Sequence, residues 1–158
     1  MAKLQNALDK KIPVWRKEIR NLIKKHGAKK ISDVSILQAY GGMRGVKGMV
    51  CDTSEVPPDK GLMIRGTPAG KLVDKTPEDI FYLLCTGELP NARDRRALTE
   101  EWNKRAKVPS YVWKVLEAMP KNSHPMCMLD TAILCMQRES KFVQAYNAGI
   151  SKMDYWKP

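Results

Sequence analysis

The 158-residue sequence lacks the features that mark several classes of protein. It has no apolar run near the roughly 18 residues that a membrane-spanning helix needs, and its N-terminus has no apolar secretory stretch. Its four cysteines show no CxxC spacing and it has only two histidines, so we expect no zinc site. Neither GxGxxG nor GxxxxGK[ST] occurs, which excludes two common phosphate-binding loops.

Candidate catalytic side chains are also scarce. His26 falls at the end of a predicted helix, and His124 precedes a proline where another helix begins. Neither has the nucleophile or orienting carboxylate that histidine catalysis requires, so we interpret both as structural. Cys127 and Cys135 lie in apolar runs, where reduced core thiols of an intracellular protein are the default. We therefore assign no catalytic residue and no metal ligand.

The net charge of +11 is unevenly distributed. Residues 1–30 hold ten lysines and arginines against two acidic residues, a net of +8. Such a segment can meet nucleic acid, an anionic membrane or an acidic partner. The basic residues are not interleaved with exposed aromatics, and no nucleic-acid-binding motif is present. We therefore prefer a solvated helical face and expect neither a nucleic-acid nor a membrane partner.

Apolar periodicity and turn residues predict a mainly α chain with one small β-hairpin. The first helix repeats apolar residues at spacings of three and four, and Pro13 should kink or split it before it ends at Gly27. Residues 48–66 predict the hairpin, with its turn at 57–61. Five further helices are expected, at 77–86, 92–106, 110–119, 126–137 and 140–150.

The length is that of one ordinary domain. Such a chain can bury roughly two thirds of its unfolded surface, enough for a core. Tyr155 and Trp156 stand next to the C-terminal end of the sequence. Two aromatics there indicate a packing contact, and docking on the same domain is the commoner case.

A glycine-rich basic loop is the main candidate for a binding site. Residues 41–48 contain four glycines together with Arg44 and Lys47. Glycines let the backbone take positive φ angles and approach another group closely, and the two cations suit an anion such as a phosphate. The same pattern also fits a glycine-rich turn between two elements.

Several segments closely resemble the N-terminal region of citrate synthases, of the type found in mitochondria and some bacteria. The most specific is Ala39-Tyr40-Gly41-Gly42-Met43-Arg44-Gly45-Val46-Lys47-Gly48-Met49-Val50-Cys51-Asp52-Thr53-Ser54. Further segments that resemble this family, in the same order, are residues 61–66, 81–90, 101–106, 109–110, 122–126 and 145–156. The resemblance thus spans nearly the whole chain.

The resemblance implies an almost all-α fold with a large and a smaller helical domain, working as a dimer. Residues 1–158 would form the N-terminal part of the large domain, an incomplete fold completed by another chain. The family condenses oxaloacetate, acetyl-CoA and water to citrate and CoA. Its two catalytic histidines and its aspartate lie downstream of the region matched here, so the resemblance assigns no catalytic residue to this chain.

Two cofactor-binding positions follow from the resemblance. Arg44 matches an arginine that contacts the phosphates of CoA, in agreement with the loop chemistry. Lys152 stands where relatives often have an arginine that reaches CoA bound mainly by the other subunit, and a lysine there keeps the charge but loses the bidentate fork. Acetyl-CoA and CoA are expected as substrate and product, with no covalently bound cofactor.

Three hypotheses follow for the function. The chain is the smaller subunit of a split citrate synthase, whose C-terminal chain supplies the catalytic residues and assembles with it into a higher oligomer. Alternatively, it is a fragment of one longer citrate synthase, or a non-catalytic binding or regulatory module with the same fold. 2-Methylcitrate formation from propionyl-CoA is the chemical alternative. No Arg- and Ser-rich transit peptide is present, so we expect a cytoplasmic location, with the mitochondrial matrix as the alternative.

Overall fold

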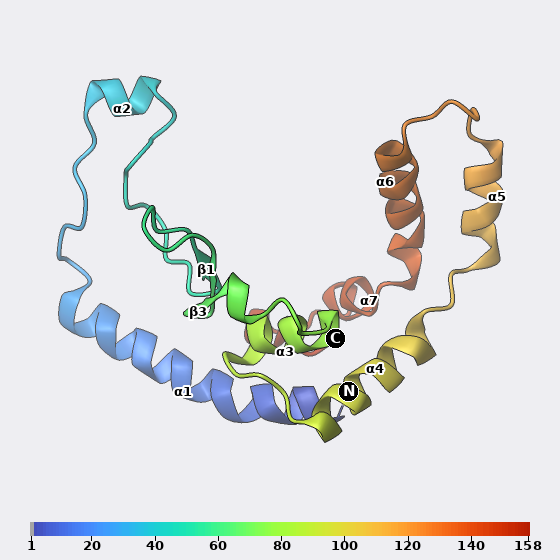
Figure 1. The fold of residues 1–158 in the computed structure, drawn as a ribbon, viewed down its shortest axis with the longest axis horizontal. Coiled ribbons are helices and arrows are strands. Elements are labelled where there is room, and N and C mark those ends of the chain that lie inside the picture. The colour runs from blue at the N-terminus through green and yellow to red at the C-terminus, as the bar shows by residue number, and fades with distance from the viewer. Residues whose placement is uncertain (1) are drawn as a thin grey trace. The chain divides into compact units, whose positions relative to one another are not determined.

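A computed structural model describes residues 2–158, with side chains from Leu4 onward. It divides into two compact units, Met1–Glu101 and Trp102–Pro158, which are described separately. Within the described residues there are seven α-helices and one small sheet (Figure 1). The prediction of a mainly α chain is therefore confirmed.

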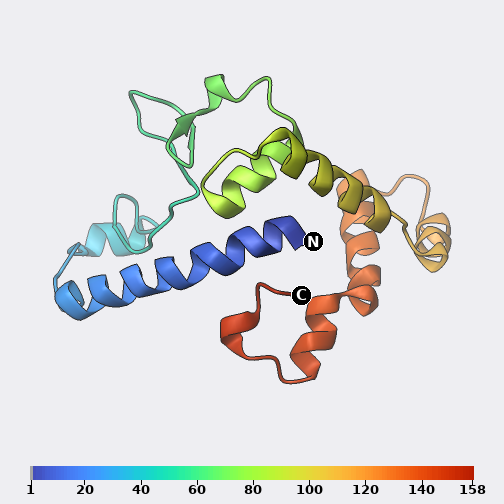
Figure 2. The ribbon, with the colours of Figure 1, turned by 90° about the horizontal axis from the view of Figure 1, so that it is seen from below.

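The first unit begins with one long helix, α1 (Ala2–His26). Pro13 lies inside it. Of the two outcomes expected for Pro13, a kink or a split, the split is wrong, and the kink stays a prediction. A proline in a helix interior removes one hydrogen bond and costs about 3 kcal/mol. The many regular turns on either side, and the packing of α1 beside α3 (Figure 2), keep the helix continuous. It ends as predicted, where the Gly27 N–H donates to the Ile23 carbonyl at 2.8 Å.

The second helix, α2 (Ile36–Tyr40), leads into a three-stranded antiparallel sheet in the order β1-β2-β3. The strands are β1 (Ser54–Glu55), β2 (Met63–Ile64) and β3 (Thr67–Pro68). Ser54 pairs with Ile64, and Ile64 pairs with Thr67. The hairpin predicted within 48–66 is confirmed, but its strands are shorter than expected, and the third strand was not predicted.

Helix α3 (Pro77–Thr86) follows a short 3₁₀ turn (Ala69–Lys71) and begins at a capping box. The Thr76 hydroxyl accepts from the Asp79 N–H, while the Asp79 carboxylate accepts from the Thr76 N–H at 3.1 Å. Pro77 occupies the first turn, and Gly87 ends the helix at a φ of 80°. These termini are those the sequence predicts, because capping is decided by neighbouring residues.

The core of the first unit lies where α3 meets α4 (Ala92–Arg105) and the segment before α3. Helix α4 begins at Ala92 as predicted, and the side-chain oxygen of the preceding Asn91 accepts from the Asp94 N–H at 2.9 Å. The buried apolar side chains of this unit are few: Leu72, Tyr82, Leu83 and Leu98.

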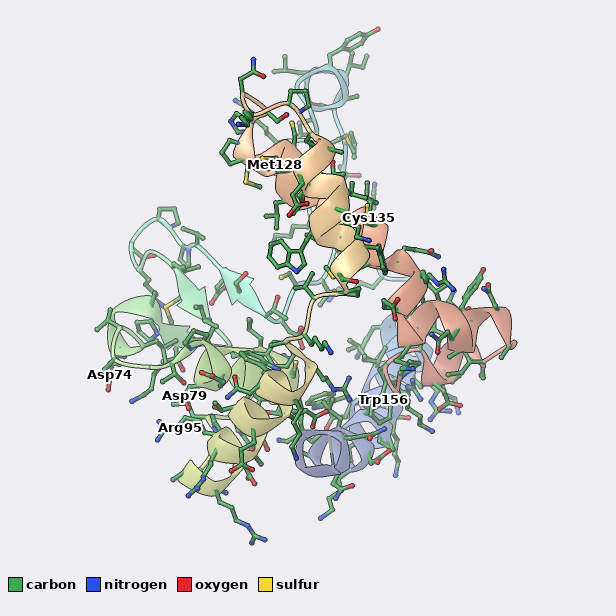
Figure 3. All side chains as sticks on the ribbon, turned by 90° about the vertical axis from the view of Figure 1, so that its right-hand side faces the viewer. Asp74, Asp79, Arg95, Met128, Cys135 and Trp156 are labelled. Atoms are coloured by element: carbon green, nitrogen blue, oxygen red, sulfur yellow. The ribbon has the colours of Figure 1, made fainter. Side chains whose placement is uncertain are left out.

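Asp79 is the one buried acidic side chain among the described residues, at 3% exposure. Burial raises the pKa of its carboxyl, but the N–H and hydroxyl of Thr76 together with Arg95 outweigh this effect and leave the pKa below its ordinary value. Arg95 reaches across from α4, with Nη1 3.4 Å from the Asp79 carboxylate (Figure 3). The ionised carboxylate therefore joins two helices.

The second unit contains α5 (Ser110–Ala118), α6 (Pro125–Cys135) and α7 (Lys141–Asn147), with short 3₁₀ turns at Met136–Glu139 and Lys152–Asp154. Helices α5 and α6 form an antiparallel hairpin (Figure 1). Val112, at 1% exposure, is its fully buried apolar residue. The Tyr111 hydroxyl donates to the Cys135 carbonyl at 3.2 Å and so fastens α5 to the end of α6.

The C-terminal aromatics dock on this same unit, as the commoner case predicted. The Tyr155 ring meets Phe142 edge to face at 5.4 Å and lies 5.9 Å from Tyr146. Trp156 is half-buried (Figure 3), and its buried indole N–H has no hydrogen-bond partner among the described residues.

The chain leaves far more surface exposed than its mass warrants. Its accessible surface is 12824 Å², whereas a compact protein of 17.9 kDa exposes about 8,000 Å² and two separate compact units of these lengths about 9,600 Å². The chain buries about half of its unfolded surface, so the expectation of two thirds is wrong. Whole apolar helix faces remain in contact with solvent.

Helix α6 shows this exposure most clearly. Ile133 is 55% exposed and Leu134 is 74% exposed. Cys127 is exposed and Cys135 is half-buried, and all four cysteines are free thiols. The prediction that Cys127 is a core thiol is therefore wrong for this chain, because no described segment covers its side of the helix. Among residues 2–158, no helix combines the length and apolarity needed to cross a membrane.

We expect Asp79→Asn to remove an acid-sensitive part of the stability. Because the folded-state pKa lies below the unfolded one, near 3.9, the contribution of Asp79 is complete above the unfolded value and is lost as pH falls through the folded value. An acid titration followed by far-ultraviolet circular dichroism checks this. The variant should lose helicity at neutral pH and respond less to acid. An unchanged titration would contradict the role of Asp79.

Candidate functional site

The glycine-rich loop is held at its base by α2. Ser35 and Gln38 form a capping box, in which the Ser35 hydroxyl accepts from the Gln38 N–H and the Gln38 amide oxygen accepts from the Ser35 N–H. The Gln38 amide nitrogen also reaches the Arg44 carbonyl at 3.4 Å. One side chain therefore caps the helix and ties it to the loop.

The loop backbone departs from ordinary geometry at three positions. Gly42, Met43 and Gly45 have φ angles of 78°, 60° and 75°. A Cβ on either glycine would meet nothing within 4 Å, so glycine is required there for its backbone freedom rather than for space. Met43 is stabilised by its N–H, which donates to the Gln38 carbonyl at 2.7 Å. The loop is thus a defined sequence of turns.

Both cations of the loop are exposed and available. Arg44 and Lys47 have no hydrogen-bond or ion-pair partner for their side chains among the described residues. An unpaired guanidinium can bind a phosphate through two parallel N–H donors. The geometry therefore allows the anion-binding chemistry predicted for this loop.

Lys152, the second predicted position, lies in the second unit. It begins the 3₁₀ turn Lys152–Asp154, where the Ser151 hydroxyl accepts from the Met153 N–H at 3.3 Å. Its side chain is exposed, and no described residue pairs with it. Arg44 belongs to the first unit and Lys152 to the second, so each position is characterised by itself.

The histidines are placed where the sequence predicts. His26 is the last residue of α1, in a turn with Lys24 and Lys25. His124 is the N-cap of α6, and its Nδ1 accepts from the Met126 N–H at 3.2 Å. This bond gives His124 a structural role. No group of three or more histidine, cysteine, aspartate or glutamate side chains is placed to hold a metal ion among the residues described.

Arg65 organises the segment that follows the loop, and sequence reasoning missed it. Its Nε and Nη2 both donate to the Leu84 carbonyl, at 3.0 and 2.8 Å, and its Nη1 lies 2.6 Å from the Asp52 carboxylate. Its guanidinium also lies 5.9 Å from the centre of the Trp15 ring in α1. Arg65 itself has a φ of 47°. The only sequence signal was its place just before Gly66, in a segment shared with the resembled family.

The fold and the loop together define a mainly α protein with an available cationic loop. A family model described as citrate synthase, C-terminal domain, matches residues 42–158. A probable mitochondrial citrate synthase of Caenorhabditis elegans is 39% identical over 164 residues, which cover 98% of this chain and 35% of that protein. The mitochondrial enzyme of Saccharomyces cerevisiae is 37% identical, over 92% of this chain and 32% of the relative. The peroxisomal enzyme of that yeast is 38% identical, over 91% and 34%.

The chain therefore belongs to the citrate synthase family. It spans about a third of the length of the curated relatives it matches. The assignment of residues 1–158 to the N-terminal part of the large domain stays a prediction.

We expect Arg65→Lys to loosen the segment that leads from the loop into the sheet. Lysine keeps the charge beside Asp52 but loses the two donors to the Leu84 carbonyl, a loss of about 2 kcal/mol for charged hydrogen bonds. Amide hydrogen exchange should become faster at the end of α3 and around Asp52. The control is Arg96→Lys, at an exposed pair with Glu100. Equal effects of the two substitutions would contradict the role of Arg65.

Proposed function

We propose that this chain is the smaller subunit of a two-chain citrate synthase, in which a complementary C-terminal chain supplies the two catalytic histidines and the aspartate. The observation that carries the proposal is the uncovered apolar surface of a chain belonging to this family. Exposed apolar patches of this extent mark interaction surfaces. Such residues occur on both units. Leu37 of the first unit is 82% exposed, and Leu134 of the second unit is 74% exposed.

The chemistry of the described residues also supports a partner chain that supplies the catalytic residues. The two histidines of this chain lie at helix ends. Its buried carboxylate, Asp79, already serves a capping box and Arg95. The chain offers donors for binding an anion but little for abstracting a proton from carbon. In this proposal the complete assembly condenses oxaloacetate with acetyl-CoA and water, releasing citrate and CoA.

Within that assembly, Arg44 contacts the phosphates of CoA, and Lys152 reaches the CoA bound mainly by another subunit. The exposure of both side chains and the pinned turns around Arg44 support these roles. A lysine at 152 contributes a point charge rather than a planar fork, so we assign the larger share of the CoA contact to Arg44. The assembly is an oligomer of such two-chain units.

Three alternatives remain distinct from this proposal. A fragment of one longer citrate synthase has the same uncovered faces, and the intact mass of the natural polypeptide distinguishes it. A regulatory module of the same fold is stable and soluble without a partner. A 2-methylcitrate synthase subunit uses propionyl-CoA in place of acetyl-CoA.

The matched relatives are named mitochondrial or peroxisomal. A cytoplasmic location for this chain is part of the proposal, with the mitochondrial matrix as its alternative.

We expect the purified chain to form no citrate alone and to restore activity when mixed with the complementary chain. The release of CoA thiol from acetyl-CoA in the presence of oxaloacetate measures this, and propionyl-CoA in parallel tests the alternative substrate. The complementary chain should also shield apolar surface, which lowers the fluorescence of a bound hydrophobic dye. Citrate formation by the chain alone would overturn the proposal.

In the reconstituted assembly, we expect Arg44→Gln to raise the KM for acetyl-CoA about tenfold with little change in kcat, as for a lost charged hydrogen bond in binding. The KM of Arg44→Lys should lie between that of the unaltered chain and that of Arg44→Gln. Lys152→Arg should lower the KM or leave it unchanged. Arg96→Gln, remote from the loop in sequence and paired with Glu100, is the matched control. A fall in kcat alone would contradict a binding role for Arg44.

A further inference from the structure

A hollow of about 410 Å³ lies within the first unit, away from the glycine loop. Asn6, Ala7, Lys10 and Lys11 line it from one face of α1. Tyr82 of α3, and Arg93 and Asp94 at the start of α4, form its other walls. Figure 2 shows α3 and the start of α4 beside the N-terminal half of α1. The volume is within the range of small-molecule sites.

Some charges at this hollow are already paired. The Lys11 ammonium lies 2.6 Å from the Glu88 carboxylate. The Asp94 carboxylate accepts from the Asn91 amide at 2.9 Å. The Lys11 ammonium offsets the charge of Glu88. Asp94 keeps its negative charge, because the Asn91 amide is a neutral donor.

Two cations remain uncommitted there. Lys10 and Arg93 have no ion-pair or hydrogen-bond partner for their side chains in the part of the chain that the structure describes. They approach from different helices, α1 and α4. Cations without such a partner that line one hollow favour the binding of an anion there.

Tyr82 adds a hydroxyl donor. Its residue is 8% exposed, and no described residue hydrogen-bonds its hydroxyl. Burial raises the pKa of this hydroxyl, and the negative charges of Asp94 and Glu88 raise it further. The hydroxyl therefore stays protonated and offers an unused O–H donor at the side of the hollow near α4.

We propose that this hollow binds a small phosphate-bearing anion through Lys10, Arg93 and the Tyr82 hydroxyl. A phosphate presents three acceptor oxygens in a tetrahedral arrangement, which suits a hollow lined by donors from three helices. A planar carboxylate has only two oxygens and satisfies fewer of these donors. The site shares no residue with the Arg44 loop, so it stands whether or not the proposed function is correct.

The test uses the full chain and inorganic pyrophosphate as the probe, in an isothermal titration at low and at moderate salt. We expect saturable binding of one pyrophosphate at this hollow. Tyr82→Phe should weaken it several-fold and Arg93→Gln about tenfold, as for a charge-assisted contact. Succinate, with two carboxylates, should bind more weakly than pyrophosphate.

Matched variants separate this site from other cationic surfaces. Arg96→Gln lies on the same helix as Arg93 and does not line the hollow, and Arg44→Gln removes the loop cation; neither should change the affinity of this site. Circular dichroism confirms that each variant keeps its helices. Non-saturable binding, equal weakening by Arg96→Gln, or full affinity in both Tyr82→Phe and Arg93→Gln would overturn the proposal.

Discussion

The first unit depends on the guanidinium of Arg65. It joins the carbonyl of Leu84 at the end of α3, the carboxylate of Asp52 before the sheet, and the Trp15 ring of α1. These segments are distant in sequence, and the strands between them are only two residues long. Strands this short contribute few backbone hydrogen bonds. The partly buried guanidinium of Arg65 therefore holds these segments together, as an extended sheet would in another fold. Arg65 holds Asp52, which follows the glycine loop, and Gln38 holds the loop where it leaves α2.

The uncovered apolar surface and the scarcity of candidate catalytic groups are both properties of the described residues. The chain spans about a third of the length of the matched relatives, and many of its apolar side chains are exposed. Arg44 is presented by its own loop, which Gln38 ties to α2. A catalytic centre, in contrast, needs acid, base and oxyanion donors brought together from distant parts of a fold.

Sequence reasoning succeeded where neighbouring residues decide the structure. The helix predicted at 77–86 is α3, and the neighbouring Thr76 and Gly87 cap its two ends. Apolar periodicity predicted the mainly α class. It failed where distant contacts decide. Pro13 stays helical within a long helix that packs beside α3, and Cys127 is exposed because no described segment covers it. The loop could be singled out because its signals are contiguous, whereas the hollow near Tyr82 takes its walls from three helices and has no contiguous motif.

The exposed area also determines how this chain responds to denaturants and heat. The dependence of unfolding free energy on denaturant, and the heat capacity of unfolding, both scale with the surface that unfolding newly exposes. A chain that already presents 12824 Å² to water has less surface left to expose than a compact protein of the same mass. We therefore expect its transitions to be broader, and its heat-capacity change per residue smaller, than those of a compact domain. A partner that covered the apolar faces would increase the surface exposed on unfolding, and with it both quantities. The sharpness of unfolding would then depend on the partner as well as on the chain.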